Sequence, residues 1–204
     1  LPHGRQLSLN QFGLQVLDVR DPHRLQIEGS LANPGYSNEA YVVGDFAIVL
    51  TDSPLGYLGE RRDFDVPRGA VGAATIVDLH DPTDPMRVER IEGARGYAGS
   101  RLLHRDGRAL LHVAWRNPDG WTGTVERFDV SAGHFQVLQT VDVAGDVLQS
   151  TAQQLLLAFR FSENRREMEQ LTVVDLSSET MVVGQGAIIP DLPTGYSQLS
   201  DLSR

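Results

Sequence analysis

Residues 75–85 read TIVDLHDPTDP, an apolar run that ends in Asp78 and leads into a turn rich in aspartate and proline. The same phrase, several apolar residues followed by an aspartate, recurs three more times along the chain. The recurrences end in Asp18, Asp129 and Asp175, so that neighbouring aspartates of the set lie 46 to 60 residues apart. A chain that repeats one phrase at such intervals is expected to repeat one structural unit.

A second marker has a similar spacing. Glycines stand at Gly35, Gly96, Gly145 and Gly195, and tyrosine follows three of them, at Tyr36, Tyr97 and Tyr196. Two independent markers with a period near 50 residues therefore indicate internal repeats.

Each repeat contains four short extended runs. Between the glycine and the aspartate, two apolar runs flank a tight polar turn, as residues 39–43 and 46–50 do around Gly44 and Asp45. The run that ends in the aspartate and a short run after its turn supply two more. Four strands in a unit of this length are typical of a β-propeller blade. We predict an all-β fold, a propeller of four-stranded antiparallel blades, with roughly four blades in this chain.

The repeats also set the expected boundaries. We expect one domain over residues 1–204, with complete blades at 36–91, 97–141 and 146–190 and partial repeats at 1–31 and 196–204. Pairing of residues 196–202 beside residues 6–10 would close a fourth blade and leave no open edge. A segment of a larger propeller is the alternative, and a β-sandwich is another arrangement of short strands. Residues 162–171 are expected to form a loop between two strands of one blade.

Composition excludes several kinds of chemistry. The 204 residues, 41% hydrophobic and 22% charged, are ordinary for one globular domain. The chain has no cysteine and its 18 basic residues are all arginine, which excludes thiol catalysis, disulfides and a P-loop lysine. A net charge of -9 disfavours nucleic acid and anionic membranes as partners. No apolar run approaches the roughly 20 residues of a membrane helix.

The phrase at residues 76–85, followed by Gly96 and Tyr97 and by residues 107–111 (GRALL), resembles the bacterial LVIVD-repeat proteins and the secreted proteins with a C-terminal β-propeller, distantly related to WD40 repeats. The resemblance extends from Gly13 to Tyr196 and concerns a structural motif. It implies a propeller fold and export to the envelope or exterior of a bacterium. The third repeat departs from the pattern, with Gly145 followed by Asp146 and no Asp-Pro turn.

The loops between the second and third strands of the blades are candidates for binding, because this face surrounds the channel mouth where most propellers bind ligands. These loops combine aromatic residues with arginine, residue types that are enriched where proteins bind partners or stack on sugars. The candidates are Tyr57, Arg61, Arg62, Phe64, Trp121, Arg165 and Arg166. Alternatively, the aromatic residues fold back as local loop cores and the charges form a solvated rim.

The first strand of each blade is expected to line the channel. Polar residues after the repeated glycines, among them Glu39 and Arg101, could there hold water, an ion or a small polar ligand. Alternatively, Glu39 and Arg101 form an ion pair with each other.

Metal sites and cofactors find little support in the sequence. Asp21, Asp81 and Asp84 offer oxygen ligands and leave calcium as an alternative, but the turn preferences of Asp followed by Pro account for them. His104 and His112 are expected to face each other across a hairpin, without an obvious third ligand for zinc. We therefore predict no cofactor.

These observations predict a non-enzymatic binding or scaffold module of a bacterial secreted or cell-surface protein, which recognises a protein or a glycan through its loop face. No catalytic motif with readable spacing is present. The alternative is a propeller hydrolase acting on a glycan or lactone-like substrate with carboxylates at the channel mouth, from the set Glu39, Asp63, Asp65 and Glu163. We expect no nucleic acid and no membrane insertion. A homodimer or the remainder of a larger propeller chain is expected as the assembly partner.

Overall fold

The computed structural model describes residues 4–10, 13–32, 36–52, 72–93, 96–117, 122–151, 153–163, 166–184 and 186–190. Within these ranges the chain forms sixteen β-strands and no helix. In this described part, accordingly, no helix has the length and apolar character needed to span a bilayer.

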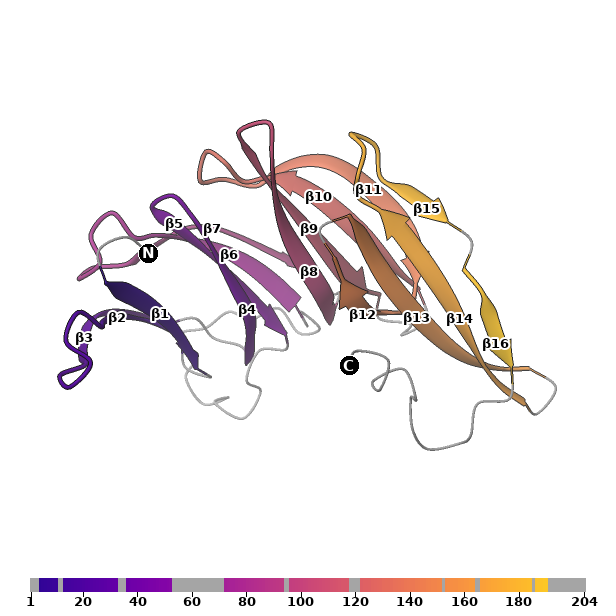
Figure 1. Cartoon of the computed structure of the whole chain (residues 1–204), viewed down its shortest axis with the longest axis horizontal. Coiled ribbons are helices and arrows are strands. Elements are labelled where there is room, and N and C mark those ends of the chain that lie inside the picture. The colour runs from indigo at the N-terminus through magenta and orange to yellow at the C-terminus, as the bar shows by residue number, and fades with distance from the viewer. Residues whose placement is uncertain are drawn as a thin grey trace.

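The strands form four antiparallel sheets in chain order, which we name A to D (Figure 1). Sheet A consists of β1 (Arg5–Asn10), β2 (Gly13–Asp18) and β3 (Gln26–Ala32). Sheet B consists of β4 (Tyr36–Val43), β5 (Phe46–Asp52), β6 (Gly72–Asp78) and β7 (Met86–Gly93). Sheet C consists of β8 (Gly96–Arg105), β9 (Arg108–Arg116), β10 (Thr122–Asp129) and β11 (Gln136–Ala144). Sheet D consists of β12 (Asp146–Ser150), β13 (Gln154–Glu163), β14 (Arg166–Asp175), β15 (Val182–Gly184) and β16 (Ile188–Pro190), with β15 and β16 both paired to β14.

The pairing registers repeat from sheet to sheet. In sheet A, β1, β2 and β3 correspond to the second, third and fourth (outer) strands of the other sheets. By this correspondence, the repeated aspartate always ends the third strand. It lies opposite the first residue of the second strand in sheets A, B and D (Arg5, Phe46 and Gln154) and opposite Leu110, the third residue of β9, in sheet C. A β-bulge then interrupts the pairing with the outer strand after Val16, Ile76 and Arg127 in sheets A, B and C. The repeat seen in the sequence is thus a repeat of register, and it defines equivalent positions in the four sheets.

The core lies between the sheets as three layers. One apolar cluster joins sheets A and B and includes Val16 and Val49; the next joins sheets B and C around Ile76 and Leu111. The third joins sheets C and D and includes Val125 and Leu157. Since successive residues of a strand point to opposite faces, sheets B and C bury both faces and are apolar on both.

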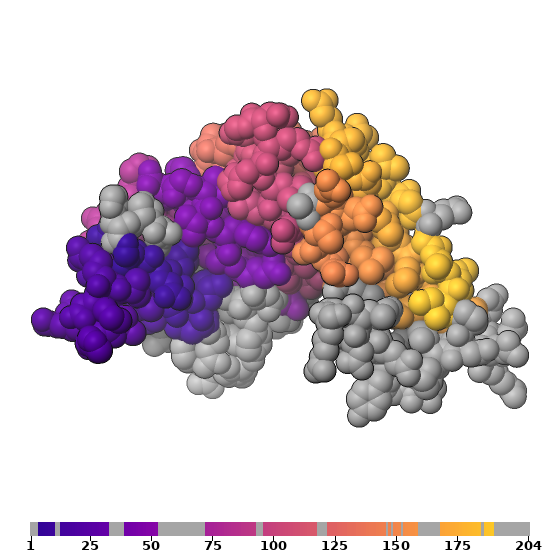
Figure 2. Space-filling view, viewed as in Figure 1, coloured from indigo at the N-terminus to yellow at the C-terminus, as the bar shows by residue number. Residues whose placement is uncertain are grey.

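The sheets fan out side by side, with sheet A at one end and sheet D at the other (Figure 1). In the space-filling view their colour bands follow one another in chain order (Figure 2). The predicted all-β fold of four-stranded antiparallel blades is confirmed; sheet A has three strands. Residues 196–202, expected to pair beside β1, lie outside the described residues, so closure of a fourth blade stays a prediction.

One expectation about the fold is wrong. Residues 162–171, expected to form a loop, belong mostly to β13 and β14, which pair without interruption from Gln154 opposite Asp175 to Glu163 opposite Arg166. The charged residues of this stretch obscure the alternation that usually reveals a strand.

Candidate functional site

The four repeated aspartates build turns. The carboxylate Oδ1 of Asp18, Asp78, Asp129 or Asp175 accepts the backbone N–H two residues further on, at 3.0, 2.8, 3.0 and 2.7 Å respectively. Hydrogen bonds to the ionised form lower a carboxyl pKa. Arg20 lowers the pKa of Asp18 to about 2 in this way. At Asp129, burial would raise the pKa, but hydrogen bonds from Ser131 and Arg108 outweigh it and the pKa is lowered.

The Asp-Pro turns follow the same logic. Asp81 Oδ1 accepts the Thr83 N–H at 2.9 Å and the Thr83 hydroxyl at 2.7 Å, and Asp21 Oδ1 accepts the His23 N–H at 2.9 Å. Two of the three carboxylates named as calcium ligands, those of Asp21 and Asp81, thus point at their own turns. Among the described residues, no three His, Asp or Glu side chains gather where they could hold a metal ion.

The expected pairing of His104 with His112 is wrong. His104 lies opposite Ala109, whereas His112 lies opposite Arg101. The reason is the two-residue turn at residues 106–107, which pairs Arg105 with Arg108 and sets the register of the whole hairpin.

A cluster of hydroxyl groups joins β4 and β8, the first strands of sheets B and C, which we call the inner strands. The carboxylate of Glu39 accepts hydrogen bonds from the Tyr41 hydroxyl, at 2.8 Å, and from the Ser100 hydroxyl. The Tyr97 hydroxyl donates to Ser100 Oγ at 3.0 Å, and Tyr41 Oη lies 3.0 Å from the same oxygen. Burial raises the pKa of Tyr41 to about 12 and raises that of Tyr97 as well, so both phenols are neutral donors at neutral pH. We call these four residues the hydroxyl cluster.

Arg101, the other inner-strand residue expected to bind, lies near this cluster. The registers align it with Tyr41 of sheet B and Gln149 of sheet D, because these residues lie opposite Ile48, His112 and Leu156, which are themselves equivalent. Its Nε is buried and finds no hydrogen-bond acceptor among the described residues. Within the same part of the chain, no ion pair joins Arg101 to Glu39, whose carboxylate is taken by hydroxyl groups.

A buried arginine and histidine connect sheets C and D. Arg127, only 2% exposed, donates from Nε to Nε2 of His112 at 2.8 Å and from Nη1 to the carbonyl oxygens of Ser178, at 3.2 Å, and Glu179. Burial and the nearby Arg127 charge lower the pKa of His112 to about 4. The imidazole is therefore neutral and accepts from the guanidinium, which holds sheet D to sheet C.

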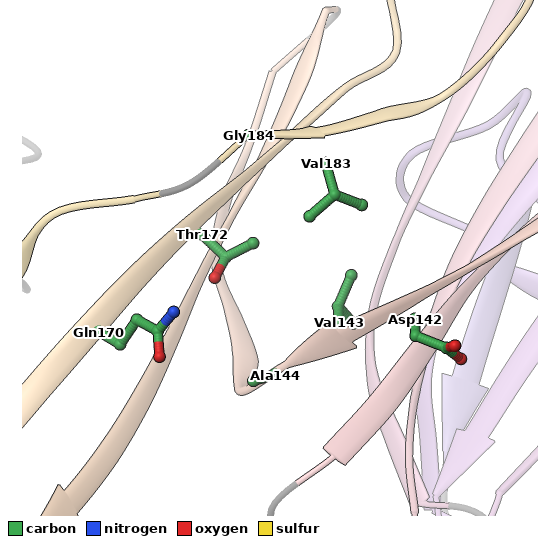
Figure 3. Close-up of a pocket in the computed structure, with 7 residues that line it drawn as sticks. All are labelled: Asp142, Val143, Ala144, Gln170, Thr172, Val183 and Gly184. Atoms are coloured by element: carbon green, nitrogen blue, oxygen red, sulfur yellow. The ribbon is translucent and has the colours of Figure 1, made fainter.

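An open groove of about 270 Å³ runs between the outer strands of these same two sheets. Val143 of β11 and Val183 of β15 point toward each other across it, and Thr172 of β14 lies beside them (Figure 3). Asp142, Ala144, Gln170 and Gly184 complete its lining. This volume is small for a ligand site, since drug-sized ligands occupy pockets of roughly 300 Å³ or more.

Most of the loop residues expected to bind a partner lie outside the described residues: Tyr57, Arg61, Arg62, Phe64, Trp121 and Arg165. Arg166 is the first residue of β14, in a strand where a loop was expected, and its side chain is also outside the description. The registers do locate the edge from which these loops leave. The inner strands begin opposite the ends of β5 and β9, with Tyr36 opposite Asp52 and Gly96 opposite Arg116. The hydroxyl cluster thus lies close to the edge where the loops at residues 53–71 and 118–121 begin and end.

Sequence reasoning named Glu39 and Ser100 among the polar residues that follow the repeated glycines, but it missed their hydrogen bonds to the two tyrosines and the whole buried Arg127–His112 contact. Tyr97 was noted only as a repeat marker, and Tyr41 carries no local motif. Arg127 did leave a signal, because it is a charged residue at the position where the other repeats have Val16, Ile76 and Val173.

Comparison with known proteins supports the fold. No protein-family model matches the chain, and no curated protein matches it either. Among solved structures, the N-terminal domain of Nup159 is similar with a TM-score of 0.50 and 10% identity over 91% of this chain and 46% of that one. A complex containing S. cerevisiae Dbp5 and Nup159 gives 0.49 at 10% identity, covering 91% and 45%, and a Lactobacillus plantarum protein gives 0.41 at 15% identity, covering 92% and 68%.

The similarity to the Nup159 domain concerns the fold alone, which is that of a β-propeller. This chain spans less than half the length of that one. Together with the repeated four-stranded sheets, the comparison identifies the chain as β-propeller in architecture.

Proposed function

We propose that this chain is a non-enzymatic binding and scaffold module of a bacterial secreted or cell-surface protein, of the LVIVD-repeat kind. It recognises a protein partner through the loops between the second and third strands of its sheets. It requires no cofactor for this task.

The observation that carries the proposal is the contrast between the two edges of the sheets. At one edge the turns are uniform: residues 44–45, 106–107 and 151–153 join first to second strands, and residues 19–25, 79–85, 130–135 and 176–181 join third to outer strands. At the other edge the connections range from the single residue Gly145, and the pairs 11–12 and 164–165, to residues 53–71. Binding residues are typically carried by variable loops on a constant scaffold. The edge with variable loops is therefore the better candidate for recognition.

The composition of these loops favours a protein partner. Tyr57, Phe64 and Trp121 stand in them together with four arginines, and aromatic residues with arginine dominate the binding energy of protein interfaces. The hydroxyl cluster near this edge supports a scaffold role, because its donors and acceptors satisfy one another between sheets B and C. The hydroxyl cluster thus holds sheets B and C together, and specificity for a partner comes from the connections between the second and third strands.

The test compares two triple variants, each of which replaces three apolar or aromatic residues by serine. Tyr57→Ser, Phe64→Ser and Trp121→Ser are combined in the first variant. The control combines Leu25→Ser, Met86→Ser and Val137→Ser, at positions that are 57 to 62% exposed and distant in sequence from these loops. Both variants and the parent chain are applied to an array of bacterial envelope and secreted proteins and to a printed glycan array, with and without a calcium chelator.

Binding to array proteins that the loop variant loses and the control retains is the expected result, with about a tenfold loss or more because hot-spot residues are removed. Loss in the control alone would move recognition to the outer strands and overturn the proposal. Binding to glycans alone would replace the protein partner by a sugar. Hydrolysis of an array glycan would replace the binding module by an enzyme.

A further inference from the structure

Four sheets packed in a row share three interfaces and leave two end faces. The end face of sheet D lies opposite the layer that joins it to sheet C. Leu155, Leu157 and Val174 belong to that layer, so alternation along the strands directs the residues between them to the other side. The far face of sheet D therefore presents Leu156, Ala158, Leu171, Val173 and Ile189.

The equivalent positions in the other sheets are internal. The registers align Leu156, Ala158, Leu171 and Val173 with Ile48, Leu50, Ala74 and Ile76 of sheet B, all of them at most 1% exposed beneath sheet C. In sheet C the same positions hold His112, Ala114, Val125 and Arg127, at most 2% exposed beneath sheet D. In sheet D all four residues are only half-buried. The far face of sheet D thus has the composition of an interface between sheets.

Sheet A ends the row differently. Its far face presents Gln6, Ser8, Gln15 and Leu17, at the positions where sheet B places Ala47, Val49, Thr75 and Val77 against sheet A. Three of these four residues of sheet A are polar. A polar outer face is what terminal repeats of stacked proteins use to meet solvent. Sheet A of one molecule is therefore a poor cover for sheet D of another.

We propose that the far face of sheet D is a dimer interface and that a second copy of this chain occupies it with the same face. Head-to-tail addition would place Gln6, Ser8 and Gln15 on an apolar surface and leave their amide and hydroxyl groups without partners. Pairing the far face with itself buries apolar residues on both sides. Such a contact is isologous, so it closes at two copies about a twofold axis.

The rest of the same face is compatible with this contact. The register gives the next positions of this face to two polar pairs, Glu169 opposite Arg160 and Asp175 opposite Gln154, which border the apolar residues at the two ends of the strands as polar residues border the core of an interface. Val182 at the margin, opposite Asp175, is 55% exposed and extends the apolar area toward the outer strand. Gln149 of β12 is exposed at the margin of this face. Its equivalent in sheet B is Tyr41, whose hydroxyl contacts Ser100 of sheet C. The interface involves none of the loop residues of the proposed recognition site, so either proposal can fail without the other.

The test measures the mass of the protein in solution and the accessibility of the far face of sheet D to a thiol reagent. Light scattering after size exclusion is expected to give twice the 22.4 kDa of the chain. The double variant Leu171→Arg and Val173→Arg is expected to give the monomer mass, because it places four like charges in the interface. Gln6→Arg with Gln15→Arg on sheet A is the matched control and keeps the dimer. If the arginine variant fails to fold, Leu171→Ser with Val173→Thr replaces it and weakens the dimer at least about tenfold.

The absence of cysteine makes a second readout clean. Val173→Cys reacts with a thiol reagent about tenfold more slowly above the dimer dissociation constant than after dilution, whereas Gln15→Cys reacts at the same rate at both concentrations. A monomer with a readily labelled Val173→Cys overturns the proposal and points to another occupant, such as a further blade. A monomer in which this thiol is protected overturns it in favour of cover from the same chain. Larger assemblies that protect Gln15→Cys overturn it in favour of head-to-tail addition.

Discussion

Arg127 and His112 show how one residue position can change role between repeats. Both occupy places that are apolar in sheet B, where the equivalents are Ile76 and Ile48. Burial of a guanidinium is costly unless its donors are satisfied. Here one donor meets the neutral His112 ring, and others meet carbonyl groups in the turn of sheet D. The apolar contact of one repeat has become a polar contact in the next.

This contact predicts a destabilisation in mild acid. The unfolded chain binds a proton at His112 below its ordinary pKa of 6.5, whereas the folded chain does so only near pH 4. Stability therefore falls as the pH drops from 6.5 to about 4, by up to about 3 kcal/mol. Urea unfolding across this range measures the slope, which His112→Gln should remove while an amide still accepts from Arg127.

His80→Gln is the control for that measurement. His80 is exposed, and its hydrogen bond to Asp78 together with the charge of Asp45 raises its pKa, so its own contribution has the opposite sign. This variant should therefore keep the acid sensitivity. The aspartate turns act at lower pH, because a lowered carboxyl pKa costs stability only below about pH 4, and at Asp18 down to about pH 2. An unchanged slope in His112→Gln would refute the assignment.

At the scale of strands and turns, the sheets interlock by a recurring contact. The turn before each outer strand packs against the preceding sheet. Gly29 of β3 lies so close to the turn of sheet B that a Cβ there would clash with the Pro82 carbonyl oxygen. Glu89 of β7 accepts the Phe135 N–H of sheet C at 2.8 Å, and Gln139 of β11 exchanges two hydrogen bonds with the Met181 backbone of sheet D. Gly29, Glu89 and Gln139 are equivalent, since each lies opposite the residue before the bulge.

Gly133 offers a test of this packing. Its φ is +73°, and a Cβ would lie 2.5 to 2.8 Å from the ring of Phe46 in sheet B. Gly107 has a similar φ of +76° with open space around it. Gly133→Ala should therefore cost about 1–3 kcal/mol more than Gly107→Ala, because only the first adds a clash to the shared backbone strain. Denaturant unfolding measures both.

Phe46→Leu distinguishes the two causes. If the ring is the obstacle, this substitution should recover part of the stability lost by Gly133→Ala, in a double-mutant cycle with a coupling energy of at least about 0.5 kcal/mol. If Gly133→Ala and Gly107→Ala lower the free energy of unfolding equally, the turn of sheet C moves away from Phe46 without loss of stability, and the packing argument is wrong.

Locality decides which of these features the sequence could predict. The aspartate phrase and the tight turns were readable because each depends on residues within a few positions of one another. The register of His104 and His112 depended on the exact turn, and the strands at residues 162–171 were hidden by charge. The hydroxyl cluster and the Arg127 contact link residues 51 to 59 positions apart in different sheets, and no local pattern records such a contact.

The molecule as a whole is a row of sheets that are unequally covered. Sheets B and C are covered on both faces, and sheet A is covered on one. Protection from hydrogen exchange should follow this order, because local opening is easiest where few apolar contacts are lost. Amides of β5, β6, β9 and β10 should exchange at least about tenfold more slowly than those of β1 to β3.

Mass spectrometry of exchanging peptides measures this order, and sheet D makes it informative. Amides of sheet D should exchange as slowly as those of sheets B and C if a second copy covers the far face of sheet D. After dilution to the monomer, they should exchange as fast as those of sheet A. Uniform protection in all four sheets would instead show that the row opens only as one cooperative unit.

The interlocking turns also bear on how such chains could be recombined. A cut between two sheets separates Gln139 from the Met181 backbone that it binds, or Gly29 from the turn around Pro82. The unit that keeps its contacts therefore runs from the middle of one sheet to the middle of the next. Chimeras of homologous repeats should join best between the turn that follows the third strand and the outer strand after it, because a joint there separates none of these contacts.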